Sequence, residues 1–245
     1  MARLLVSVRD ATEAAVALAA GVDLLDLKEP RAGALGAVSA DIVREVAGLI
    51  DARTPLSVAC GELLDGAANG PNLFSSETLS GVSYAKVGLA GCASRADWPE
   101  LWRQFASALP HGTQPVAVAY VDAAHAAAPP IESVLEITAP LGARALLLDT
   151  WGKSHGGLLN HVTLPYLAEI LSTTKRRGML TVLGGSLDLA TIEKLLPLVP
   201  DVIAVRGAAC ADRREGNVDR VKICGLVELL RRHNSPELHD PKSKF

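Results

Sequence analysis

The sequence predicts an α/β fold, a single-domain (β/α)8 TIM barrel. Short apolar runs recur eight times along the chain, at intervals of roughly 30 residues. Most of them are continuous rather than alternating, as parallel strands buried on both faces must be. Between them the apolar period becomes that of a helix. We therefore favour a closed barrel over a doubly wound sheet.

Each apolar run is expected to be one strand. The eight expected strands are residues 3–8, 24–28, 56–60, 84–89, 115–121, 145–150, 180–186 and 202–207. After the first strand, Asp10 and Glu13 have the spacing of a capping box, and Gly21 is placed to end the helix.

Further helices are expected from apolar stripes. Asp97 and Glu100 repeat the capping-box spacing before a stripe that begins with Trp98 and Trp102, which we interpret as core residues. Comparable stripes begin at Ile42, Leu164 and Ile223, whereas residues 65–81 carry the fewest helix signals.

The length and composition of the chain limit the number of domains and the kinds of binding partner that we expect. The chain has 245 residues, and no linker divides it, so we expect a barrel catalytic domain over residues 1–232 and a polar, flexible C-terminal tail over 233–245. A net charge of -3 and the lack of a basic cluster argue against nucleic acid and anionic membrane as partners. The expected partner is a small molecule; a homo-oligomer stays open, because barrels often associate.

No cofactor or metal is expected. The four cysteines lie far apart, the histidines lack zinc-ligand spacing, and neither dinucleotide nor P-loop glycine motifs occur. The first apolar run is too short for a signal sequence or a membrane span, so a reduced, cytoplasmic location is expected.

Candidate catalytic residues stand at the carboxyl ends of the expected strands, where the active sites of such barrels lie. Asp26 and Lys28 share one side of their strand, and the barrel mouth is a cheaper place for this charged pair than the face beneath the helices. Lys86, Asp149 and Lys153 occupy corresponding places. Alternatively, Lys28 forms an ordinary ion pair at the rim with Asp26 or Glu29.

Several lysines in one narrow mouth favour imine chemistry. Mutual repulsion and desolvation lower the pKa of an amine from about 10.4 towards neutrality. A neutral lysine attacks a carbonyl group to form an imine, and a second lysine then moves protons at the neighbouring carbon.

Phosphate binding is expected after the seventh and eighth strands. Gly185 and Ser186 follow the seventh strand, and Arg206, Gly207 and Ala208 end the eighth, where such barrels often bind phosphate. Alternatively, these are plain turns, or Arg206 points outward and the backbone alone binds. The glycine-containing loop after Lys28 either folds over a ligand or is only a connection.

Six segments resemble the (5-formylfuran-3-yl)methyl phosphate synthases, also named 4-(hydroxymethyl)-2-furancarboxaldehyde-phosphate synthases, of methanofuran biosynthesis. Between residues 3 and 210 these segments are LLVSVRD, GVDLLDLKEPRAGALGA, GVSYAKVGL, LLLDTWGKSHG, LGGSL and AVRGAAC. Where the family pattern has Asn-Pro, this chain has Glu29-Pro30, and the residues between Asp149 and Lys153 match loosely.

The resemblance implies a carbon-oxygen lyase acting on phosphates in one-carbon cofactor biosynthesis. Two glyceraldehyde 3-phosphate molecules are condensed to a furan aldehyde phosphate, with loss of phosphate and water. It further implies that Lys28 forms the Schiff base, that Lys86 accepts the proton, and that Asp149 and Lys153 assist. The competing interpretations are a class I aldolase or phosphosugar isomerase, and a non-catalytic barrel that binds a phosphorylated metabolite.

Overall fold

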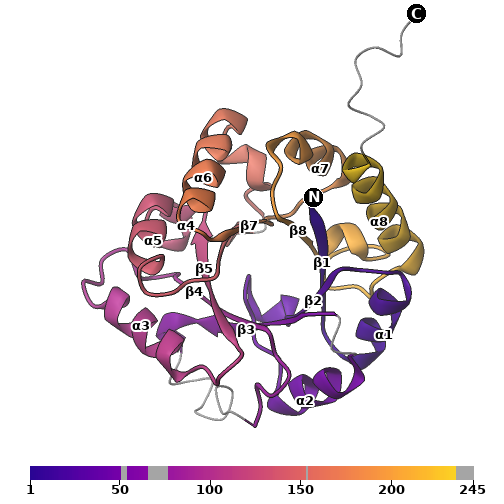
Figure 1. Cartoon of the computed structure of the whole chain (residues 1–245), viewed down its shortest axis with the longest axis horizontal. Coiled ribbons are helices and arrows are strands. Elements are labelled where there is room, and N and C mark those ends of the chain that lie inside the picture. The colour runs from indigo at the N-terminus through magenta and orange to yellow at the C-terminus, as the bar shows by residue number, and fades with distance from the viewer. Residues whose placement is uncertain (51–53, 66–76, 153, 236–245) are drawn as a thin grey trace, which may run out of the picture.

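Eight parallel strands close into a barrel in which each strand pairs with its sequence neighbours and β8 pairs with β1. The protein is described here by a computed structural model that covers residues 1–50, 54–65, 77–152 and 154–235. Figure 1 shows the helices arranged around the ring of strands. The predicted (β/α)8 barrel is therefore confirmed.

Every predicted strand is present, with shifts of a few residues at the ends. The strands are β1 (Arg3–Val8), β2 (Leu24–Leu27), β3 (Leu56–Glu62), β4 (Tyr84–Gly88), β5 (Gln114–Tyr120), β6 (Ala145–Asp149), β7 (Leu180–Leu183) and β8 (Val202–Val205). β2 ends one residue earlier than expected, so Lys28 opens the following loop. β3 continues to Glu62, two residues beyond the predicted end.

Helices cover the outside of the barrel, and one short helix, over Ala123–Ala126, packs instead against the inward core. They are α1 (Ala11–Ala19), α2 (Ala40–Leu49), α3 (Trp98–Ala108), α4 (Ala123–Ala126), α5 (Ile131–Thr138), α6 (Leu164–Arg176), α7 (Leu189–Leu195) and α8 (Arg220–Asn234). The segment 65–81, where the helix signals were fewest, lies largely outside the described residues.

The two predicted capping boxes differ from expectation. Asp10 caps α1 by accepting the backbone N–H of Glu13 at 2.9 Å, but the Glu13 carboxylate turns to Arg9 instead of closing the box. At α3 the predicted box is wrong: Asp97 makes no side-chain cap and pairs with Arg95 at 2.6 Å. Each carboxylate is drawn to a nearby guanidinium, because a charged donor binds it more strongly than a neutral N–H.

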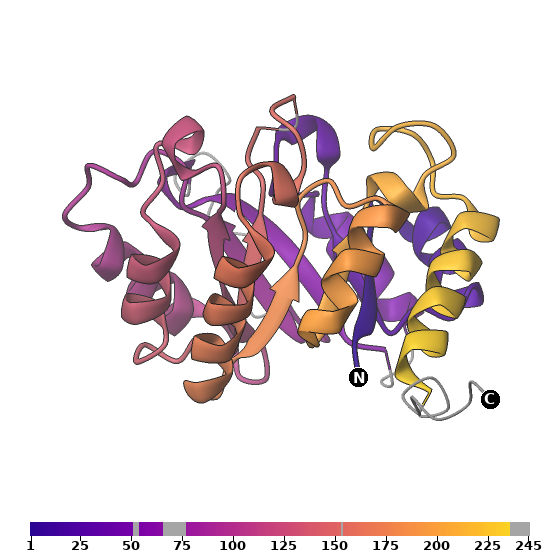
Figure 2. The ribbon, with the colours of Figure 1, turned by 90° about the horizontal axis from the view of Figure 1, so that it is seen from above.

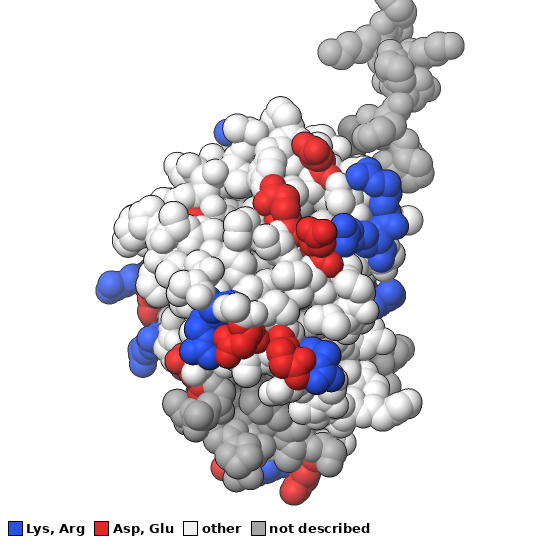
Figure 3. Space-filling model, turned by 90° about the vertical axis from the view of Figure 1, so that its left-hand side faces the viewer, with Lys and Arg blue, Asp and Glu red and all other residues white. Residues whose placement is uncertain are grey.

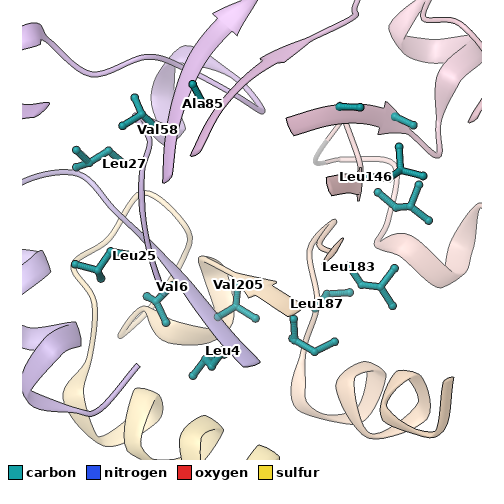
Figure 4. Close-up of a cluster of buried hydrophobic side chains, with 14 of the residues drawn as sticks. Leu4, Val6, Leu25, Leu27, Val58, Ala85, Leu146, Leu183, Leu187 and Val205 are labelled. Atoms are coloured by element: carbon teal, nitrogen blue, oxygen red, sulfur yellow. The ribbon is translucent and has the colours of Figure 1, made fainter. Parts of the chain in front are cut away.

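Alternate residues of each strand face opposite sides, and this parity creates two cores. Leu25, Leu27 and Ala85 belong to the outer core between strands and helices, where Figure 4 shows them. Leu24, with inward residues of the other strands, forms the second core inside the barrel. Because successive strand side chains point to opposite faces, Asp26 must point inward with Leu24.

The register of the first strands sets polar residues side by side in the barrel interior. Ser7 of β1 is paired with Asp26 of β2, and Asp26 is paired with Ser57 of β3. Lys86 on β4 is paired with Ala59, the next inward residue of β3. The sheet itself therefore gathers a carboxylate, two hydroxyls and an amine in one layer.

The chain ends of the barrel are tied together. The side-chain amide of Asn234 accepts the backbone N–H of Ala2 at 3.0 Å and donates to its carbonyl at 2.9 Å. α8 thus runs two residues past the expected end of the barrel domain at residue 232, and part of the expected tail is helical.

Candidate active site

A cavity of about 320 Å³ opens at the carboxyl ends of the strands. Its walls carry residues from β1, β2, β4, β6 and the loops after β7 and β8. The predicted residues in the wall are Asp26, Lys28, Lys86, Asp149, Gly185, Ser186, Arg206, Gly207 and Ala208. The fold therefore brings nine of the ten predicted site residues to one cavity, and the tenth, Lys153, lies outside the described residues.

Asp26 and Lys86 form a buried ion pair inside the mouth. The Lys86 Nζ donates to Asp26 Oδ1 at 2.5 Å and to the Ser57 hydroxyl at 3.3 Å. The Ser7 hydroxyl donates to the second carboxylate oxygen of Asp26 at 2.9 Å. The carboxylate fixes the amine at the cavity wall, because a buried charge must be paired and hydrogen-bonded.

Lys28 stands just past the end of β2, on the same side of the chain as Asp26. Its backbone N–H donates to the carbonyl of Val8 at 3.0 Å, so the position of its backbone is set by β1. The side chain lines the cavity, and the residue is only 9% exposed. Lys28 and Lys86 thus line one cavity together.

Asp149 ends β6 and also faces the cavity. It is 4% exposed, and its Oδ1 accepts the backbone N–H of Thr150 at 2.7 Å. The next residues are held by the buried Asp122, whose carboxylate accepts the N–H groups of Trp151 and Gly152, each at 2.8 Å. The backbone leading towards position 153 is therefore fixed up to Gly152.

The loops after β7 and β8 present backbone N–H groups. Gly185 and Ser186 adopt left-handed backbone conformations, with φ of 88° and 52°, and the second is unusual for a residue other than glycine. No protein acceptor is found in the described part of the chain for the N–H groups of Gly185, Ser186, Gly207 and Ala208. These four N–H groups, together called the N–H cup below, are suited to bind an anion.

Arg206 is committed to the protein. Its guanidinium binds the Glu13 carboxylate at 2.5 and 3.1 Å, and it also donates to the carbonyls of Ser7, Arg214 and Gly216 at 3.0, 2.8 and 2.6 Å. A guanidinium has five N–H groups, and these five bonds use all of them. Arg206 does not point outward, because it is buried, and it has no N–H group left to offer a ligand in the cavity.

The loop after Lys28 covers the interior of the mouth. Its residue Leu35 is 1% exposed and packs among the inward residues of the barrel, and its carbonyl accepts the N–H of Gly61 at 2.9 Å. A Cβ on Gly36 would lie 2.3 Å from the carbonyl oxygen of Glu29. The loop thus packs against the inward core, and its bend requires glycine at position 36.

One polar pair at the mouth was missed from the sequence. The Tyr120 hydroxyl, at the end of β5, donates to Glu62 at 2.6 Å, and the other oxygen of Glu62 accepts the N–H of Ala90. Burial raises the pKa of both side chains. A Cβ on Gly88 would lie 2.1 Å from Glu62, so glycine makes room for the pair. An acidic residue beyond a predicted strand end was the available signal.

The match to a protein family follows the whole barrel. Residues 4–227 match the family described as 4-HFC-P synthase. The chain belongs to this family. Its curated relatives include the (5-formylfuran-3-yl)methyl phosphate synthase of Methanococcus maripaludis strain C5, 30% identical over 233 residues, which cover 93% of this chain and 99% of the relative. The same enzyme of Methanococcus aeolicus is 28% identical over 92% of this chain and 98% of its own.

Several solved structures have a fold similar to that of this 4-HFC-P synthase family member. The phosphoribosyl anthranilate isomerase of Thermotoga maritima has a TM-score of 0.59 at 15% identity, with 95% of this chain and all of that one covered. KGPDC from Streptococcus mutans has a TM-score of 0.61 at 11% identity, over 96% of this chain and 100% of its own. At such identities the likeness concerns the barrel alone. No helix in the described ranges is long and apolar enough to cross a bilayer.

Proposed function

We propose that this 4-HFC-P synthase family member condenses two molecules of glyceraldehyde 3-phosphate into (5-formylfuran-3-yl)methyl phosphate through a Schiff base on Lys28. The observation that carries the proposal is the pairing of Lys28 with a second buried lysine, Lys86, in the wall of one cavity. Imine chemistry needs both a nucleophilic amine and a nearby group that exchanges protons.

The first stage is imine formation. The amine of Lys28 adds to the aldehyde of one triose phosphate to give a carbinolamine, which must lose its hydroxyl group as water. The ammonium form of Lys86, held by Asp26, supplies the proton for this step and becomes neutral. The acid of the first step is thereby prepared as the base of the second.

The second stage is carbon-carbon bond formation. Neutral Lys86 removes a proton from the carbon beside the iminium group and produces an enamine. The enamine carbon attacks the aldehyde of the second triose phosphate. Elimination of one phosphate and ring closure, which expels the Lys28 amine, complete the furan with a net loss of two water molecules over the whole reaction. Proton transfer in these steps is assigned to Asp149 and to Lys153. The reaction belongs to the carbon-oxygen lyases that act on phosphates.

The retained phosphate is assigned to the N–H cup. Four N–H groups that have no protein acceptor among the described residues belong to two loops that line the cavity. Their partial positive charges and their geometry suit a phosphoryl group, which carries several acceptor oxygens. The substrate class is therefore a small phosphorylated aldehyde.

The deciding experiment is a product assay with glyceraldehyde 3-phosphate as sole substrate. We expect an ultraviolet-absorbing furan aldehyde phosphate, identified by its mass, and release of inorganic phosphate. A cleavage or isomerisation product without a furan would assign the protein to the aldolases or isomerases instead. No turnover and no covalent trapping would leave only binding of a phosphorylated metabolite.

Borohydride trapping tests the nucleophile. Reduction in the presence of substrate should attach triose phosphate to Lys28, as peptide mass analysis would show. Lys28→Arg should lose both trapping and product while keeping its circular dichroism spectrum, because arginine keeps the charge but forms no imine. Lys194→Arg, at an exposed position on α7, is the matched control and should behave as wild type.

A further inference from the structure

Three arginines line the cavity after β8: Arg213 is exposed, whereas Arg206 is buried and Arg214 is half-buried. The latter two differ in how much of their hydrogen-bonding capacity the protein uses. All five N–H groups of Arg206 bind protein acceptors, and its charge is neutralised by Glu13. Arg214, eight residues further on, also lines the cavity. It makes one hydrogen bond within the described chain, from Nη2 to the carbonyl of Gly33 at 3.1 Å.

Arg214 is unusually isolated for a half-buried cation. Among the described residues its one ion-pair contact is with Glu215, whose carboxylate lies 4.0 Å from Nε, beyond hydrogen-bonding distance, and 40% of the Glu215 side chain is exposed. Burial lowers the pKa of Arg214, and the negative charges of Asp149 and Glu215 only partly oppose this effect. The protein thus holds a desolvated cation with four N–H groups that have no protein acceptor among the described residues.

The position of Arg214 connects the two halves of the proposed site. A Cβ on Gly207 of the N–H cup would lie 3.9 Å from the Arg214 Cβ. Its hydrogen bond to Gly33 reaches the loop that follows Lys28. The Arg214 side chain therefore runs from its Cβ beside Gly207 to its guanidinium beside Gly33, and the residue lines the same cavity.

We propose that Arg214 supplies the positive charge that binds the phosphoryl group of the substrate, together with the N–H cup, while Arg206 has a structural role only. The inference rests on the proposed function, since it names the partner of the substrate's phosphate. A planar guanidinium presents parallel N–H groups to two oxygens of one phosphoryl group, which a single lysine does not. The contact with Gly33 uses one N–H, and the other four have no acceptor among the residues that the structure describes.

Direct binding of inorganic phosphate, measured by isothermal titration calorimetry, is the first test. Arg214→Gln should weaken the phosphate Kd by about 10- to 100-fold, as expected for a lost charged hydrogen-bonding partner. Arg214→Lys should recover part of the loss, because the charge returns without the bidentate geometry. Arg103→Gln, which breaks an exposed pair on α3, is the control and should bind phosphate as wild type does. Wild-type phosphate affinity in a folded Arg214→Gln variant would overturn the proposal.

Trapping with two aldehydes separates phosphate recognition from imine formation. Under borohydride, Arg214→Gln should need at least ~10-fold more glyceraldehyde 3-phosphate for half-maximal labelling of Lys28. Labelling by unphosphorylated glyceraldehyde should change less than about twofold, because that ligand has no phosphoryl group for Arg214 to bind. Equal losses with both aldehydes would refute a phosphate-specific role.

The two proposals fail separately. If the protein makes no furan, the phosphate titrations still decide the role of Arg214, because they require no turnover. If furan forms but phosphate binding is unchanged in Arg214→Gln, the synthase proposal stands and the assignment of Arg214 falls.

Discussion

Asp26 is the residue on which the polar interior of the barrel is built. It is 1% exposed, and each of its carboxylate oxygens accepts a hydrogen bond, one from the Ser7 hydroxyl and one from the charged amine of Lys86. Removing one member of such a buried pair leaves an uncompensated charge, which is far more costly than the pair is stabilising. Substitutions at Lys86 and at Asp26 must therefore be compared at equal folded fraction.

Lys86→Ala tests proton transfer at the level of one amine. We expect product formation to fall by about 10²- to 10⁴-fold, the usual contribution of a positioned acid or base, with Lys28 still labelled under borohydride. Single-turnover product yield and peptide mass analysis measure the two quantities on the same folded sample. Undiminished product would remove Lys86 from the proton-transfer role.

Tyr120→Phe tests the buried pair at the end of β5. Burial raises the pKa of Glu62, and the Tyr120 hydroxyl partly opposes this, so the variant should have a still higher Glu62 pKa. A carboxyl group whose pKa is higher folded than unfolded destabilises the protein as pH rises through the folded pKa. The loss of unfolding free energy should therefore be small near pH 4 and reach about 1–3 kcal/mol at pH 8. Urea unfolding across this range measures it; a loss independent of pH would contradict the assignment.

At the scale of elements, one buried ion network joins α1, β8 and the loop after β8. Arg206 binds Glu13 in the first turn of α1, and Arg9 binds the same carboxylate at 2.8 Å. Burial alone would raise the pKa of Glu13, but hydrogen bonds from Arg206 and Arg9 outweigh it, and the pKa lies below its ordinary value. The network holds the loop that carries Arg214.

Arg206→Gln should destabilise the fold by about 3–5 kcal/mol, the usual cost of breaking a buried pair. Because a carboxylate with a lowered folded pKa contributes stability above its unfolded pKa and loses it on acidification, the difference from wild type should shrink below about pH 4. Chemical denaturation at pH 3.5 and 7 measures the effect. Arg103→Gln, whose partner Glu100 is exposed, is the control and should leave the free energy of unfolding nearly unchanged at both pH values.

Local sequence patterns predicted the strands and helices because each kind of element buries apolar side chains at its own spacing: continuous runs in strands covered on both faces, and stripes in helices. The placement of Asp26 and Lys28 at the mouth followed from strand parity together with the cost of burying a charged pair beneath the helices. The use of Arg206 was not decided by pattern, because its five acceptors come from residues up to 199 positions away. Glu62 and Tyr120 were missed for a similar reason: their partnership joins two strands that are not neighbours in the barrel.

At the scale of the whole molecule, charge is dispersed and the thiols are concealed. On the face drawn in Figure 3, acidic and basic side chains lie beside one another and most of the surface is uncharged. Cys60, Cys92 and Cys210 are buried, and only Cys224, on α8, is exposed. Burial raises the pKa of the Cys60 thiol to about 12 and thus suppresses its thiolate.

Thiol labelling should therefore report the integrity of the whole barrel. A disulfide reagent at pH 8 should modify one thiol per chain rapidly in the native protein and all four in denaturant, because only thiolates at the surface react. Cys224→Ser should abolish the rapid phase. Rapid native modification of a second thiol would contradict the packing described for β3 and the loops.

The hydrogen bonds between the Asn234 side-chain amide and the backbone of Ala2 hold the N-terminus beside the end of α8. Figure 2 shows the N-terminus and the end of α8 on the side opposite to that towards which the strand arrows point. A fusion partner or a solid support joined at the N-terminus therefore leaves the entrance for metabolites unobstructed. Proteins immobilised in this way would all have the cavity at the carboxyl ends of the strands facing the solution.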